Sequence, residues 1–153
     1  MAGEDVLPVR GRTQIDFAQL DELMSNAFMV DVIDSGADYY FKYFGDLMTV
    51  FCGVNLCGQH LSEVASAALS SSLKESYAKV VRARQPAYLK GHYVRNTVRL
   101  PIERLQIPVL DENGIVVAIW GVVIPDLTGL SLAALEGDGP ARLVGSDTLL
   151  PLD

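Results

Sequence analysis

The chain has little of what marks several common classes of protein. Its 153 residues include only two cysteines, Cys52 and Cys57, and two histidines, His60 and His92. Two cysteines cannot build the disulfide framework of a small secreted domain. So few thiol and imidazole groups, without the spacing of metal ligands, give no zinc signature. We therefore expect no metal site, and a cytoplasmic location as the default.

Long apolar runs and basic clusters are also missing. The longest apolar stretch, residues 115–124, is too short to cross a bilayer as a helix, and the acidic N-terminus is unlike a secretory signal. Twelve Lys and Arg stand against 19 Asp and Glu, a net charge of −7. Because this average field repels a phosphate backbone, we expect no nucleic-acid partner and no membrane insertion.

What is present is the composition of an ordinary globular domain, with 50% hydrophobic and 20% charged residues. A chain of this length can bury one core without staples. We divide it into a flexible N-terminal arm (1–12), one domain that includes an N-terminal helix (13–125) and a C-terminal tail (126–153). The tail is assigned on its composition of Gly, Leu, Ala and Asp.

The period of the apolar residues predicts the order of helices and strands. Spacing of three and four residues indicates helices, and alternation indicates strands. The expected elements are an amphipathic helix from Thr13 to Ala27, strands at 28–34 and 39–44, short helical turns within 45–68, a helix with an apolar stripe from Leu69 to Val81 that ends before Pro86, and strands at 87–94, 99–110 and 115–124.

This order predicts an α+β fold on an antiparallel sheet. Asn113-Gly114 is a hairpin signal between the last two strands. The last strand is apolar on both faces and is expected at the centre of the sheet. In the strand before it, the alternation of apolar and polar residues shifts by one position after Ile102. We predict a bulge near Glu103 and Arg104 to account for this slip in the apolar phase.

Three blocks of sequence then suggest a family. They are Asp38–Leu47 (DYYFKYFGDL), Phe51–Leu61 (FCGVNLCGQHL) and Leu100–Val109 (LPIERLQIPV). Together with the element order, they resemble the PAS (Per-Arnt-Sim) domain superfamily, and within it the small, mainly alphaproteobacterial single-domain PAS proteins. The similarity covers about residues 15–124. Lys42 departs from the arginine usual in that family, and lysine cannot make the same bidentate carboxylate contact.

The resemblance implies a five-stranded antiparallel sheet with helices packed on one face, enclosing a pocket. It implies a bacterial, non-catalytic sensory or adaptor domain in signal transduction, which binds a small molecule, a signalling partner protein, or both. The alternative is a ligand-independent dimerisation module whose core is filled by side chains. Outward-facing apolar residues on the sheet or on the N-terminal helix would favour a homodimer, which we expect.

Four residues are candidates for binding a ligand in such a pocket: Tyr43, His92, Arg104 and Trp120. Arg104 is the best polar anchor, because a bulge redirects the side chains beside it. The alternative, equally consistent with the sequence, is that Arg104 is a solvated charged residue on an edge strand. Tyr43 and Trp120 either line the pocket or belong to the core. His92 either faces the pocket, as the single histidine that a haem sensor needs, or faces outward or toward a helix.

The sequence identifies no cofactor. Flavin-binding light sensors carry a reactive cysteine in a Gly-x-Asn-Cys stretch, whereas here Gly53 and Asn55 are followed by Cys57 one place late. We therefore interpret both cysteines as buried structural residues. The chain also has no nucleophile elbow, no phosphate-binding glycine loop and no pair of catalytic carboxylates, so we expect no enzymatic activity.

Overall fold

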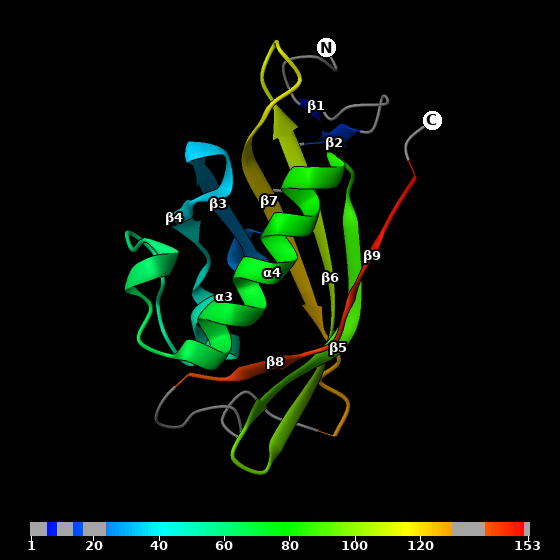
Figure 1. Cartoon of the computed structure of the whole chain (residues 1–153). Coiled ribbons are helices and arrows are strands. Elements are labelled where there is room, and N and C mark those ends of the chain that lie inside the picture. The colour runs from blue at the N-terminus through cyan, green and yellow to red at the C-terminus, as the bar shows by residue number, and fades with distance from the viewer. Residues whose placement is uncertain (1–5, 9–13, 17–23, 130–139, 152–153) are drawn as a thin grey trace.

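The computed structural model describes residues 6–8, 14–16, 24–129 and 140–151. Its main feature is a curved antiparallel sheet with two helices on one face (Figure 1). The strand order is β4-β3-β7-β6-β5-β8, and β9 also pairs with β5. The strands are β3 (Ala27–Ile33), β4 (Asp38–Phe44), β5 (Ala87–Arg95), β6 (Val98–Leu110), β7 (Val116–Pro125), β8 (Arg142–Val144) and β9 (Asp147–Leu149).

The remaining elements are short, apart from one helix. They are the helices α3 (Asp46–Cys52) and α4 (Ala67–Ala83), the 3-10 turns η2 (Met24–Asn26), η3 (Asp34–Gly36) and η4 (Leu61–Glu63), and a separate two-stranded sheet of β1 (Val6–Pro8) and β2 (Gln14–Asp16). The antiparallel α+β architecture is confirmed, and so is the central place of β7, which lies between β3 and β6. The sheet has seven strands among the described residues, not five.

Two expectations at the ends of the chain differ from the structure. Where we expected the N-terminal helix, residues 14–16 form strand β2 and residues 24–26 form η2, while residues 17–23 lie outside the described part. The C-terminal tail contains β8 and β9, which extend the sheet at β5. Strands of three residues are too short to show a period in the sequence.

Helix α4 covers the inner face of the sheet, as its apolar stripe predicts (Figure 1). The Ser66 side chain caps it by accepting a 3.2 Å hydrogen bond from Leu69 N. At its other end Arg84 adopts a left-handed conformation shortly before Pro86. One polar residue, Ser76, is buried on the stripe between Leu73 and Val80.

An aromatic cluster fills the core between β3, β4 and α4. Tyr77 lies 5.1 Å from Tyr39 and 6.1 Å from Phe28, measured between ring centroids. A bulge opposite Met29 and Val30 shifts the register of β4, so that Phe44 rather than Tyr43 follows Phe41 into the core. The alternation that we expected over Tyr39, Phe41 and Tyr43 therefore breaks after Phe41.

Hydrogen bonds of the Asp38 side chain connect the start of β4 to η4. Its carboxylate accepts hydrogen bonds from Ser62 Oγ at 2.6 Å, Ser62 N at 3.1 Å and Tyr39 N at 2.9 Å. Burial on its own would raise the pKa of Asp38, but these hydrogen bonds outweigh burial and hold the pKa below 3.8.

Candidate functional site

The slip in the apolar phase of β6 has a different cause from the predicted bulge. The pairing of β6 with β5 is regular from Val98 to Gln106, and its register with β7 shifts only between Val109 and Leu110. The bulge near Glu103 and Arg104 is therefore wrong. Instead, two polar residues take inner positions of the strand: Arg104 is 1% exposed and Gln106 0% exposed.

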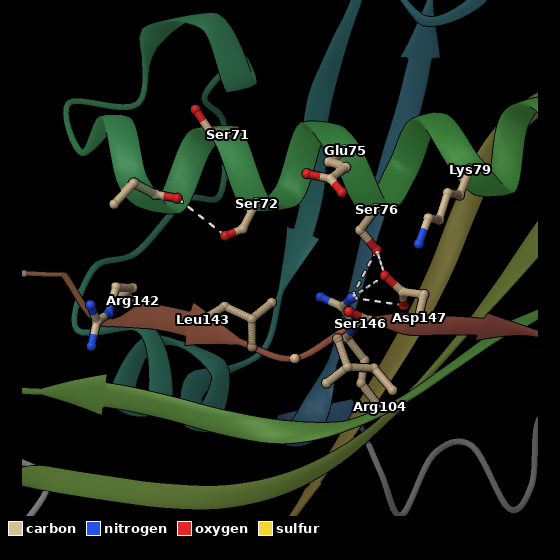
Figure 2. A pocket seen from close by; sticks show the side chains of 13 residues that line it. Ser71, Ser72, Glu75, Ser76, Lys79, Arg104, Arg142, Leu143, Ser146 and Asp147 are labelled. Carbon is tan, nitrogen blue, oxygen red and sulfur yellow. Dashed lines mark hydrogen bonds and ion pairs between the residues drawn. The ribbon is translucent and has the colours of Figure 1, made fainter.

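Arg104 is the centre of a buried polar cluster. Its Nη2 donates to Ser76 Oγ at 2.8 Å and to the two carboxylate oxygens of Asp147 at 3.0 and 3.2 Å (Figure 2). The Ser76 hydroxyl lies 2.6 Å from Asp147 Oδ2 and 2.9 Å from Gln106 Oε1. Helix α4 and strands β6 and β9 thus meet at one cation, although Ser76 and Asp147 are 71 residues apart.

The ion pair between Arg104 and Asp147 is almost fully removed from water, because the two side chains are 0% and 5% exposed. Only one of the three guanidinium nitrogens is used. Among the described residues, Arg104 Nε and Nη1 have no hydrogen-bond partner, and neither has Gln106 Nε2. Turning the Gln106 amide over would let it donate to Ser76 but would leave its oxygen unpaired. Buried donors without acceptors are costly, so the cluster is only half satisfied.

A pocket of about 340 Å³ opens beside this cluster. It lies between α4 and the C-terminal strands β8 and β9, as Figure 2 shows. Its charged side chains are three cations and two anions, and four serines add hydroxyl groups. The lining residues are Ala68, Ser71, Ser72, Glu75, Ser76, Lys79, Leu89, Arg104, Arg142, Leu143, Gly145, Ser146 and Asp147.

Three buried groups of the core near Arg104, the Cys52 thiol and two tyrosine hydroxyls, are neutral. Burial raises the pKa of Cys52 to about 11, against the opposing effect of a hydrogen bond with Tyr93 and the positive charge of Arg104. Burial also raises the pKa of Tyr77 and Tyr93 well above 10. At neutral pH these three groups are uncharged.

Of the four residues predicted to bind a ligand, only Arg104 lines this pocket. Trp120 pairs with Met29 of β3 and Ile107 of β6. Its side chain lies on the opposite face of the sheet, because its chain neighbours Ile119 and Gly121 face the core.

Tyr43 pairs with Met29 on that same outer face, and its hydroxyl donates to Met24 O at 2.8 Å. His92 is half-buried. Its chain neighbours Gly91 and Tyr93 face the core, so His92 lies on the other face of β5. The structure therefore brings Arg104 together with Ser76, Gln106 and Asp147 instead.

The two cysteines have different surroundings. Cys52 is buried at the end of α3, as expected, whereas Cys57 is exposed in the loop before η4 and lies outside the pocket. In the described ranges, no three His, Cys, Asp or Glu side chains come together as a metal site would require. Nor does any helix in those ranges have the length and apolar character needed to span a bilayer.

Comparison with other proteins shows the fold. No protein-family model matches the chain, and no curated protein matches it in sequence. A solved structure described as VqmA bound to DPO has a TM-score of 0.50 at 11% identity, over 77% of this chain and 74% of that one. A Light-Oxygen-Voltage domain studied with a flavin analogue has a TM-score of 0.50 at 15% identity, over 72% and 83%.

A further similar structure is a Vibrio cholerae VqmA dimer without its target DNA. It has a TM-score of 0.51 at 12% identity, and the match covers 73% of this chain but only 52% of that one. These likenesses support a PAS-like fold. At such low identities they say nothing about which ligand or partner this chain has.

Proposed function

We propose that the chain is a non-catalytic PAS-like sensory domain that binds a small polar molecule in the pocket beside Arg104. The observation that carries the proposal is that Arg104 lines the pocket while its buried Nε and Nη1 have no hydrogen-bond partner among the described residues. A volume of about 340 Å³ is within the range of small-molecule sites. A ligand with acceptor atoms would satisfy donors that the described residues leave unpaired.

The side chains at this site favour binding over catalysis. The pocket contains serine hydroxyls but no imidazole, since His60 and His92 are not among its lining residues. A serine nucleophile needs a base within hydrogen-bond reach, and the carboxylate nearest to Ser76 is already paired with Arg104. The site holds charge in place rather than moving protons.

The signal would pass to a partner protein in the cytoplasm, and the domain would act as a homodimer. Support for a protein interface comes from apolar side chains on the outer face of the sheet, where Leu105 is 36% and Ile124 45% exposed. Exposed apolar groups of this kind are typical of contact surfaces when they cluster. One of the similar structures is described as a dimer.

The second candidate is a dimerisation module that needs no ligand. It is favoured by the aromatic cluster of Phe28, Tyr39, Phe41 and Tyr77, which fills the space between the sheet and α4. The pocket lies to one side of that cluster. The two functions therefore differ in whether the pocket beside Arg104 is occupied.

Native mass spectrometry of the purified chain, compared with its denatured mass, distinguishes them. We expect an excess mass that disappears on denaturation, is lost in Arg104→Gln and is kept in Arg99→Gln. Arg99 is the matched control because it is an exposed arginine on the same strand. A bare dimer in all three proteins, with no binding from a panel of small polar molecules, would instead favour the dimerisation module.

A further inference from the structure

The C-terminal residues Arg142–Leu149, here called the strap, lie along the edge of β5. Arg142–Val144 pair with His92–Val94, and Asp147–Leu149 pair with Ala87–Leu89. The strap is held at its ends by hydrogen bonds from Ala141 N to Cys52 O at 2.6 Å and from Leu150 N to Pro86 O at 2.8 Å. Without it, β5 would be an open edge of the sheet.

Two glycines let the strap cross β5 at close range. Gly91 and Gly145 face each other, and a Cβ built on Gly145 would lie 3.1 Å from Gly91 Cα. A Cβ built on Gly91 would overlap the carbonyl oxygen of Val144. Gly145 also has φ = +145°, which a residue with a side chain rarely adopts. The close approach brings Asp147, two residues further on, to Arg104.

Asp147 is one of the few anchors of the strap. Along the strap only Leu143 and the Asp147 side chain are buried, and the other side chains are mostly exposed. Segments with few buried contacts open at low free-energy cost. The carboxylate of Asp147 is therefore a charged group on a segment that can detach from β5.

The pairing of Asp147 with Arg104 is incomplete. Both carboxylate oxygens contact the same nitrogen, Nη2, and Nε and Nη1 are left without partners in the described structure. A guanidinium pairs best with a carboxylate through two parallel hydrogen bonds from two nitrogens. The chain geometry of β9 does not give Asp147 that arrangement, whereas a free carboxylate can take it.

The charge of the pocket favours the same exchange. Lys79, Arg104 and Arg142 are positive, and Glu75 and Asp147 are negative, which leaves a net charge of +1 while Asp147 is inside. When the strap leaves, Arg142 leaves with Asp147, so the net charge stays at +1, but the Arg104 cation has lost its counter-ion. An anion entering the pocket then replaces the charge that the strap has removed.

From this geometry we infer that Asp147 is a tethered substitute for the ligand, and that a small carboxylate displaces it from Arg104 and releases the strap. The inference rests on the proposed function and names its ligand class and its structural consequence. Release exposes unpaired N–H and C=O groups along β5, which a partner protein can recognise by adding a strand.

The test measures binding of sodium acetate and sodium succinate to the full chain by NMR titration, at constant ionic strength. Asp147→Asn removes the tethered competitor, and Gly91→Ala pushes the strap off while leaving the side chains that α4 and β6 contribute to the pocket in place. If the strap is open in about one wild-type molecule in a hundred, both variants bind up to about a hundredfold more tightly than the wild type. Asp46→Asn, at an exposed aspartate of α3, should bind as the wild type does, and Arg104→Gln should lose binding.

A second measurement needs no variant. Hydrogen exchange of residues 142–149 in the wild type should become faster when acetate or succinate is added, while exchange in β7 stays slow. Inorganic phosphate at the same ionic strength should have less effect. Unchanged exchange in the strap, equal affinities for the wild type and both strap variants, or a preference for phosphate would each overturn the inference.

The failure of this inference is distinguishable from the failure of the proposed function. If native mass spectrometry finds a ligand that depends on Arg104 while Asp147→Asn and Gly91→Ala change nothing, the strap has no part in binding and the sensory function stands. If the pocket binds nothing in the wild type or in any variant, both fail together.

Discussion

Asp147→Asn is expected to destabilise the folded domain strongly, because it leaves the Arg104 cation buried without a counter-ion. The side chains of this pair are 0% and 5% exposed. Removing one partner of a buried ion pair typically costs about 3–5 kcal/mol. Asparagine keeps one oxygen that can accept from Nη2, and the strap can open to admit water. We therefore expect a loss near the lower end, about 3 kcal/mol in the free energy of unfolding.

In a chain of 153 residues this loss corresponds to a fall in Tm of about 6–12 °C, at roughly 2–4 °C per kcal/mol. Urea unfolding gives the free energy directly, and a double variant tests the cause. Arg104→Met with Asp147→Leu removes both charges, and apolar replacement of a whole buried pair is often neutral or stabilising. The double variant should therefore be more stable than Asp147→Asn alone. A loss below about 1 kcal/mol, which is typical of exposed pairs, would refute the reasoning.

Three further predictions concern the rest of the domain. Gly121→Ala should lower the free energy of unfolding in urea by about 1–3 kcal/mol, because a Cβ there would overlap the ring of Phe28; an unchanged midpoint would contradict the packing. A thiol reagent at pH 8 should modify Cys57 at once and Cys52 only after unfolding, because Cys57 is exposed while Cys52 is buried with its pKa raised to about 11; two fast thiols would contradict this. Asp38→Asn should destabilise more at pH 7 than at pH 2, since a folded pKa below 3.8 gives stability that is present above that value and lost as the pH falls through the folded pKa. An equal effect of Asp38→Asn at both pH values would show that its charge is unimportant.

Most of the sheet and the long helix follow from the period of the sequence, and the ends of the chain do not. Strands β5, β6 and β7 have 9, 13 and 10 residues, long enough for their apolar pattern to appear above the local variation. Strands β8 and β9 have three residues each, and their place is decided by the approach of Gly145 to Gly91. Such an approach depends on tertiary contacts that no local pattern contains.

The sequence predicts one residue of the candidate site, Arg104, and misses its hydrogen-bond partners. Arg104 was identified as a pocket residue for a mistaken reason, because the slip in the apolar phase of β6 has two explanations. A bulge restores the alternation by adding one residue, whereas inward polar residues leave the strand regular and make its inner face polar. Ser76 distinguishes the two, since it is a second polar residue on a face that the pattern marks as buried, and it lies on a different element.

Two polar interruptions on facing apolar surfaces indicate a shared polar cluster, because each residue alone would be a buried group without a partner. Arg104 and Ser76 meet this condition, and their hydrogen bond of 2.8 Å is the result. The anion of the cluster could not be found in this way. Asp147 comes from a segment without a period, and its carboxylate reaches the cluster only through the backbone path of the strap. One physical property explains both why the sequence does not indicate Asp147 and why we predict that the strap can detach. A segment that buries few side chains shows no apolar period and is held weakly against the sheet.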